Sequence, residues 1–529
     1  MAQYGTLSRL GSQRHGARDG SALVIKCHNE RLFDARTFRA LDPLATTQRY
    51  FWILAVLAAI VLLAPIRAGD LAGYDDARYA LVAKHVVLSG HWLEIESNGG
   101  PALEHPPLFS WIEAALFIPF GLSDPLAKLP SAVCGLGVIL LVAWLDRRIT
   151  GSPFAGVLAM FVMATSVYFI KYAARAMTDV PFTFFFLSAV CCWLLGEEEP
   201  RWFLAAGAFA ALAQLTRAMA GLSIPLLFAV DLIVNRRRVP LRYLIGTALV
   251  AFLPPAAWYA QWIARYGGEF FVRNSLYMNQ EVTGELSPAW RRYTGAFEYI
   301  WMISKSYWPW LPAMIAGIVF VVRKKDRRFS ILIPWIAVVY VLCAITKSRV
   351  LRYMLPAYPA FAILSAIGLL WLLPERYVRN GLRVLTPLLA IAVLVIAIRP
   401  PVNLHAVDTR PIALASTAAT EPGERITFYD DGAVRWDEMN EMLWYGDRYF
   451  AEVWDSAELP AALRKPQTRV FIMDVNTFDA QVESRIPNQI IARAGHLICF
   501  RLLNPQAATI ENGTRSVSRP DADSISPEP

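Results

Sequence analysis

Long apolar runs recur along the chain between residues 50 and 399. The first run, 50–66, follows about fifty polar, arginine-rich residues and has no small-residue cleavage site after it, so it predicts a retained membrane span. About ten further runs have the length of a helix that crosses a bilayer: 127–145, 152–170, 180–195, 202–216, 218–234, 241–263, 302–322, 329–346, 353–373 and 382–399.

One apolar run does not fit this series. Residues 107–121 are short for a span and carry Glu113, which favours a helix lying at the membrane interface. The pattern as a whole predicts a polytopic α-helical membrane protein with about 11–13 transmembrane helices.

Composition supports the same class. The chain is 56% hydrophobic and 18% charged, whereas soluble domains are about 45–50% apolar and about 25% charged. These values exclude a set of soluble domains and a disordered chain. Six cysteines in 529 residues are no disulfide scaffold. The net charge of +8 lies in short clusters between apolar runs, which is typical of membrane orientation and argues against a nucleic-acid partner.

The basic clusters predict the sidedness of the chain. If 107–121 does not cross, the basic N-terminus and every cluster between spans lie on the cytoplasmic side, as the positive-inside rule requires. If it crosses alone, those clusters lie outside. The first arrangement predicts outward loops at 67–126, 171–179, 264–301 and 347–352. The predicted clusters are 147–148, 236–242, 323–328 and 376–383.

The tail after about residue 400 differs from the rest. Short β-like runs alternate with polar segments there: 425–429, 468–473, 490–491 and 497–503. We therefore expect a basic cytoplasmic segment (1–48), a membrane domain (49–400), a small α/β or α+β extracytoplasmic domain (401–505) and a disordered, Ser/Pro-rich tail (506–529).

Charged residues gather in the outward loops, where the orientation rule does not place them. Ionisable groups at membrane depth are costly and point to a function with a named partner. Arginines beside acids are suited to a lipid phosphate, held by charge-assisted hydrogen bonds. The acids are Asp75, Asp76, Glu104 and Asp179, and the basic candidates are Arg78, His105, Arg175, Arg273, Arg349 and Arg352.

Structural roles compete with this interpretation. Asp75 or Asp76 can cap the amphipathic segment that follows, and Asp179 can cap the next span. The basic residues at 347–352 can snorkel to lipid phosphates without a function. None of these roles explains why two acidic loops and two basic loops reach the same membrane face.

Five sequence blocks resemble the aminoarabinose lipid A transferase family, the bacterial branch of the dolichyl-phosphate-mannose protein mannosyltransferase superfamily. The first four agree with that family in order and spacing over roughly residues 50–235, and the fifth is a weaker echo. The blocks are Tyr74–Ala80, Glu104–Leu108, Leu129–Ala132, Arg175–Pro181 and Ser348–Pro356.

The resemblance implies a GT-C fold glycosyltransferase that uses a polyprenyl-phosphate sugar. It implies that Asp75 is the leading catalytic carboxylate and Asp179 the second acid, with Tyr353 near the lipid phosphate. Glu104 matches the glutamate before two prolines. His105 departs from the family's lysine, so a permanent charge is replaced by a titratable one. Asp76 also departs, because the bacterial branch usually has glutamate there.

The expected reaction is displacement of polyprenyl phosphate at the anomeric carbon. The developing charges suit a carboxylate near the sugar and arginines near the phosphate. The expected acceptor is lipid A or another envelope glycan at the periplasmic face of the bacterial inner membrane. No cofactor is required by this chemistry; a divalent cation at Glu104 and His105 is the less favoured alternative. A flippase for the lipid-linked sugar and a protein O-glycosyltransferase stay open as alternative functions.

Overall fold

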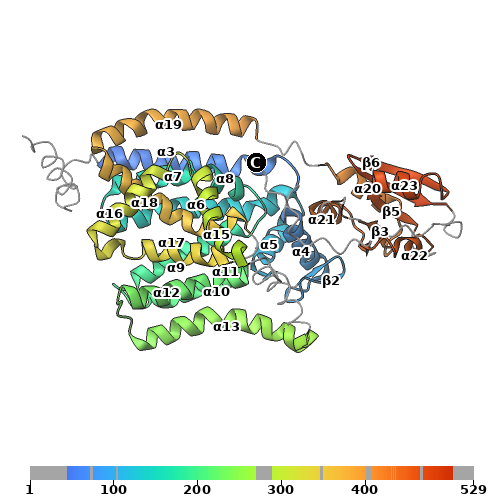
Figure 1. The fold of residues 1–529 in the computed structure, drawn as a ribbon, viewed down its shortest axis with the longest axis horizontal. Coiled ribbons are helices and arrows are strands. Elements are labelled where there is room, and N and C mark those ends of the chain that lie inside the picture. The colour runs from blue at the N-terminus through green and yellow to red at the C-terminus, as the bar shows by residue number, and fades with distance from the viewer. Residues whose placement is uncertain are drawn as a thin grey trace, which may run out of the picture.

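The computed structural model describes residues 44–71, 75–102, 105–269, 289–345, 349–400 and 407–503, apart from 431, 433, 435 and 465–468. Most of these residues form a bundle of long helices. A smaller domain with a β-sheet lies beyond one end of the bundle, and we call that end the outer end (Figure 1).

Every apolar run predicted to span the membrane is helical. Within the described part of the chain, six helices are long and apolar enough to cross a membrane, or eight if each of two bent pairs is one span. The bundle helices are α3 (Leu44–Leu63), α6 (Asp124–Thr150), α7 (Pro153–Ala164), α8 (Val167–Ala173), α9 (Asp179–Leu195), α10 (Trp202–Thr216), α11 (Ala218–Gly221), α12 (Ser223–Val234), α13 (Leu241–Tyr266), α15 (Ala289–Ser306), α16 (Leu311–Lys324), α17 (Leu332–Ile345), α18 (Tyr358–Leu372) and α19 (Glu375–Ile398).

Several predicted spans form bent or shorter helices in the structure. The run 152–170 is split into α7 and α8, which meet at a bend of 68°, and the pair α15–α16 bends by 120°. Helices α9, α10 and α11–α12 are shorter apolar helices. The α10 helix ends at Thr216 because Arg217 adopts an extended backbone before α11 begins.

Small residues bring helices α16 and α18 into backbone contact. A Cβ atom added at Gly317 would lie 2.0 Å from the Leu364 carbonyl oxygen, and one at Gly368 would lie 1.9 Å from the Ala313 carbonyl oxygen. Such close approach is how helices pack in lipid, where burial from water does not drive their association. The contact fixes α18, which directly follows the segment that carries Arg352.

The first of the loops predicted to face outward folds over the outer end of the bundle. It contains η1 (Pro65–Arg67), α4 (Asp76–Ser89), the short hairpin β1 (Glu96–Ser97) and β2 (Gly100–Pro101), and α5 (Leu108–Phe120). The apolar α5 lies beside α4, between the long helices and the sheet domain (Figure 1). This position agrees with an interfacial helix.

The C-terminal domain is an α/β domain with a mixed five-stranded sheet in the order β4-β3-β5-β7-β6. Strands β4, β3 and β5 are parallel, and β7 is antiparallel to β5 and β6. The sequence missed β4, which is short and half-exposed. The elements are α20 (Arg410–Ala418), β3 (Ile426–Tyr429), α21 (Trp436–Tyr445), β4 (Phe450–Val453), α22 (Leu459–Arg464), β5 (Val470–Asp474), α23 (Val475–Gln481), β6 (Asn488–Ala494) and β7 (Leu497–Leu502).

This domain is attached to α4 and the start of α6 by buried polar contacts. The Lys84 ammonium of α4 donates to the carbonyl oxygens of Trp444 (3.0 Å) and Gly446 (2.6 Å). The Asp124 carboxylate accepts from the Trp444 indole and the Tyr445 hydroxyl, each at 2.8 Å. The domain is therefore attached to the helix that begins directly after Asp75.

Candidate active site

Asp75 lies at the turn into α4, where a capping role was the competing interpretation. It occupies the N-cap position, but its side chain makes no capping hydrogen bond. Its carboxylate instead lies 3.4 Å from the Arg352 Nη2 atom and 3.9 Å from the Arg78 Nη1 atom. The carboxylate is therefore oriented by guanidinium groups and not by the backbone of α4.

Asp179 is the first residue of α9, and capping is wrong for it as well. The N-cap is Thr178, which makes no side-chain cap, while the 2% exposed Asp179 carboxylate forms an ion pair with Arg217. The Arg352 Nε atom lies 4.0 Å from the same carboxylate. The structure thus brings together the two acids that the sequence proposed as catalytic.

Arg352 connects the two acids. Its side chain is 9% exposed and lies within 4.0 Å of both carboxylates, so the snorkelling interpretation is wrong for this residue. It belongs to the 3₁₀ segment η3 (Leu351–Ala357) that leads into α18. The Tyr353 ring lies between two cations, 4.8 Å from the Arg217 guanidinium carbon and 5.7 Å from that of Arg352.

Guanidinium groups surround the two acids of this cluster. The guanidinium groups of Arg78, Arg217 and Arg352 face the carboxylates of Asp75 and Asp179. Burial alone would raise the pKa of Asp75, but the charges of Arg352 and Arg78 outweigh it and hold that pKa below its ordinary value. Asp75 is therefore ionised, and guanidinium groups of this kind suit an anionic group of a substrate.

His105 lies beside Asp75 in a state that the sequence did not predict. Its Nε2 atom is 3.3 Å from Arg78 Nη1, and its ring centroid is 5.0 Å from that of Tyr79. Burial, assisted by the charge of Arg78, lowers the pKa of His105 to about 3. The imidazole is therefore neutral near pH 7 in this structure, and the expected role of His105 at the donor phosphate stays a prediction.

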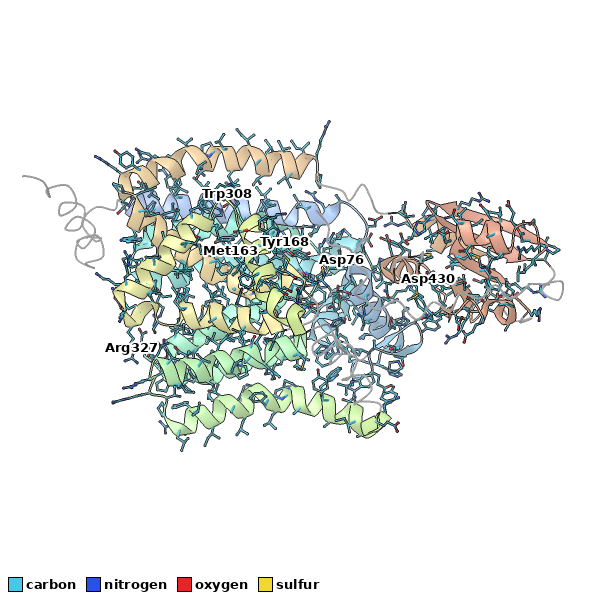
Figure 2. The ribbon with its side chains drawn as sticks, viewed as in Figure 1. Asp76, Met163, Tyr168, Trp308, Arg327 and Asp430 are labelled. Carbon is cyan, nitrogen blue, oxygen red and sulfur yellow. The ribbon has the colours of Figure 1, made fainter. Side chains whose placement is uncertain are left out.

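Asp76 differs from its neighbour. It begins α4 with its side chain inside the protein, and Figure 2 shows it at the outer end of the bundle. Burial raises its pKa to about 7, against the lowering effects of Arg175 and Lys128. Adjacent aspartates thus have opposite shifts, and Asp75 alone is permanently charged near neutral pH.

The remaining predicted site residues make contacts of their own. Arg349 forms an ion pair with Glu298 of α15 and donates to the Thr294 hydroxyl at 3.1 Å. Arg175 lies 6.0 Å from the Tyr172 ring. Glu104 and Arg273 lie outside the described residues. Their roles, like those of the other site residues, stay predictions.

Arg217 is the residue that sequence reasoning missed. It is a single cation between two apolar runs, 202–216 and 218–234, and the sequence analysis assigned it no role. In the structure it is the ion-pair partner of Asp179. The signal was present: a lone arginine at a one-residue junction on the predicted outward side is an ionisable group at membrane depth without an orienting role.

The described residues contain no group of three His, Cys, Asp or Glu side chains arranged to hold a metal ion. What the site offers is fixed positive charge: guanidinium groups that hold two carboxylates and can bind a phosphate. An ionised acid beside such a phosphate site is suited to chemistry at the carbon attached to the phosphate.

Comparisons with known proteins agree with this description. A family model described as dolichyl-phosphate-mannose-protein mannosyltransferase matches residues 104–258. The undecaprenyl phosphate-alpha-4-amino-4-deoxy-L-arabinose arabinosyl transferase of Edwardsiella ictaluri is 23% identical over 330 residues, covering 60% of this chain. The chain spans 58% of the length of that relative.

Solved structures show the fold. The crystal structure of ArnT from Cupriavidus metallidurans bound to undecaprenyl phosphate matches with a TM-score of 0.68 at 17% identity, covering 87% of this chain and 98% of that one. The oligosaccharyltransferase of Archaeoglobus fulgidus matches with a TM-score of 0.53 at 13% identity, covering 80% and 68%. The predicted GT-C architecture is confirmed.

Proposed function

We propose that this protein, an ArnT-like member of the GT-C fold class, is a membrane glycosyltransferase that moves a sugar from a polyprenyl-phosphate donor to lipid A or another envelope glycan. The observation that carries the proposal is the cluster of Asp75, Asp179, Arg217 and Arg352 at the outer end of the bundle. The reaction takes place on the periplasmic face of the bacterial inner membrane, where the basic clusters between spans would leave this end.

The donor binds with its chain in the bilayer and its phosphate among the guanidinium groups. Arg352 and Arg217 are held by carboxylates and flank the Tyr353 ring, so they are fixed before the donor arrives. Preorganised cations stabilise the charge that appears on the departing phosphate without reorganising during the reaction. Arg349 would serve the donor only after leaving Glu298.

In the transfer step, the acceptor oxygen forms a bond to the anomeric carbon while the bond from that carbon to the phosphate oxygen breaks. The bonding electrons leave with polyprenyl phosphate, and positive charge develops on the sugar ring. The ionised Asp75 carboxylate is the group suited to that positive charge. If the acceptor is a hydroxyl, Asp75 also takes its proton; if it is a phosphate, no base is needed.

Two alternative functions lead to different products. A flippase would use the same positive site and leave the bond to the phosphate intact. A protein O-glycosyltransferase of the same fold would require Asp75 as a base, because a serine or threonine hydroxyl must lose its proton. The likeness to the arabinosyl transferase of Edwardsiella ictaluri favours a transferase over a flippase.

The test compares cells that contain the protein with cells that lack it. Mass spectrometry of lipid A, polysaccharide and polyprenyl-phosphate pools should show one sugar mass missing from one acceptor without the protein, with the lipid-linked donor accumulating. Unchanged glycans with the donor stranded in the inner leaflet would contradict the proposal and support a flippase.

Complementation with variants separates the site from the fold. Asp75→Asn should restore no transfer although the protein is inserted normally. The matched control is Glu96→Gln, which removes one negative charge from the same outward loop, in the hairpin strand β1. Equal loss of transfer in both variants would mean that the general charge of the loop, and not the Asp75 site, is required.

A further inference from the structure

A groove lies between α3 and α19 at the end of the bundle opposite the candidate active site. Both helices start at that end and run side by side toward the outer end (Figure 1). The groove has a volume of about 360 Å³. Its lining residues are Thr46, Arg49, Tyr50, Ile53, Arg383, Thr386, Pro387 and Ala390.

The polar part of the groove can donate hydrogen bonds and carries only positive charge. The two guanidinium groups of Arg49 and Arg383 lie on opposite walls, and the lining residues include no acid. Arg383 makes a hydrogen bond of 3.3 Å to the neutral Asn380 side chain. Among the described residues, no carboxylate forms an ion pair with either arginine. The groove is therefore complementary to an anion.

Thr386 supplies a second, independent observation. It is 5% exposed, and its Oγ1 atom has no hydrogen-bond partner among the described residues. A buried hydroxyl usually finds a partner, and in a helix the carbonyl four residues earlier is the usual one. Thr386 lines the groove, so its unbonded hydroxyl is a donor that an oxygen atom of a bound group can satisfy once the side chain turns toward the groove.

The sequence places both arginines at the same membrane boundary. Arg49 is the last charged residue before the apolar run of α3, and Arg383 is the last before the apolar run of α19. Arginine side chains at such boundaries reach the level of lipid phosphates. Ile53 and Ala390 lie about 6 Å and about 10 Å deeper along their helices, at 1.5 Å per residue. The walls thus change from cationic to apolar toward the bilayer centre.

We propose that this groove binds one anionic phospholipid, with the phosphate between Arg49 and Arg383 and an acyl chain along Ile53, Pro387 and Ala390. Basic pockets between transmembrane helices are known to hold lipid headgroups in this way. A soluble phosphate would use the guanidinium groups but gain nothing from the apolar floor. The site is separate from the glycosyl-transfer site, and neither proposal depends on the other.

The experiment measures lipid retention on the purified full-length chain by native mass spectrometry. Phosphatidylglycerol or phosphatidylethanolamine is titrated into the detergent-solubilised protein. We expect tighter binding of phosphatidylglycerol and a loss on the order of 30-fold in the double variant Arg49→Ala, Arg383→Ala, from the typical surface attraction of each cation. Equal binding of the two lipids would overturn the proposal.

Three comparisons distinguish a built site from diffuse attraction. The control variant Lys324→Ala, Lys325→Ala removes two cations from the same side of the membrane, outside the groove, and should retain the lipid; an equal loss would overturn the proposal. Thr386→Val keeps the charge and shape, and should weaken binding several-fold. Unchanged lipid binding in Thr386→Val would contradict a built site, and Arg49 and Arg383 would then only reach the lipid phosphates at the membrane surface. Competition by millimolar inorganic phosphate would identify a soluble anion in place of the lipid.

A second double variant separates lost lipid binding from misfolding. Arg49→Lys, Arg383→Lys keeps both charges and should retain most of the phosphatidylglycerol preference. If the alanine variant elutes as an aggregate, the lysine and Thr386→Val variants still decide the question. A lysine variant without the lipid preference, together with an unaffected Thr386→Val, would refute the site.

Discussion

Buried aspartate–arginine pairs lie at both ends of the helical bundle, and they differ in how completely each is satisfied. At the end opposite the outer end, which we call the inner end, Asp231 is fully buried and pairs with Arg237. The Trp193 indole (2.8 Å) and the Asn235 amide (2.5 Å) donate to its two oxygens. At the outer end, Asp179 pairs with Arg217, and Arg352 is shared with Asp75.

The difference lies in the neighbours of each pair. Arg237 also contacts Glu197, which in turn binds Arg327 at 3.1 Å, so the inner cluster has a carboxylate for each cation. Figure 2 places Arg327 at the end of the bundle away from Asp76. Among the described residues of the outer cluster, Arg352 lies within 4.0 Å of both Asp75 and Asp179. The same residue pair is therefore held by an indole and an amide at one end, and shares a second arginine with another acid at the other.

The largest effect is expected from Asp75→Asn. The amide keeps the size of the carboxylate but cannot balance positive charge or accept a proton, so transfer to a hydroxyl acceptor should fall roughly 10²–10⁴-fold. The measurement is single-turnover transfer of a labelled sugar by purified protein. The melting temperature should fall less than in Asp179→Asn, because Arg352 keeps Asp179 as a second carboxylate partner. Transfer within tenfold of wild type would exclude a catalytic base.

Asp231→Asn tests whether the inner ion pair contributes to stability alone. Removing one partner of a buried ion pair typically costs about 3–5 kcal/mol, because the other charge is left uncompensated. We expect a markedly lower melting temperature but wild-type transfer per folded molecule. Asp179→Asn should also lower the melting temperature and, unlike Asp231→Asn, abolish transfer in the folded fraction. Equal specific activities in Asp179→Asn and Asp231→Asn would contradict the proposed difference between the two ends.

The pH dependence of stability should reveal Asp76. Its folded pKa of about 7 lies above the ordinary 3.8, so between these values the folded state holds a proton that the unfolded state releases. Its contribution to stability is then complete below about pH 4 and is lost as the pH rises to 7. Asp76→Asn removes this slope. The check is the melting temperature of both proteins from pH 4 to pH 8; parallel curves would contradict the shifted pKa.

The smallest effect is expected from His105→Gln. The neutral imidazole supplies no charge, and glutamine can still accept the hydrogen bond from Arg78, so transfer should change less than about threefold. The pH–rate profile between 5 and 8 should keep its shape. A basic limb that disappears in the variant would show that the histidine titrates in this range and that its burial is relieved in the working enzyme.

Much of the molecule could be predicted from the sequence because the signals are local. A run of apolar residues is helical in lipid, since every backbone group must be satisfied within the segment. The charges that end these runs predict sidedness, and the β-like runs after residue 424 predicted four of the five strands of the C-terminal sheet. Asp75 and Asp179 were singled out because acids are rare at that depth, and the family resemblance implied their catalytic roles.

What only the tertiary structure decided depends on contacts between distant segments. Whether Asp75 caps α4 or faces a cation depends on Arg352, 277 positions away, and the role of Arg217 depends on Asp179, 38 positions away. The charge of His105 depends on burial beside Arg78. Hydropathy and the spacing of motifs depend only on the order of residues along the chain. Ion pairing and desolvation depend on distance in three dimensions, so a lone arginine and a histidine acquire their roles only when the helices pack.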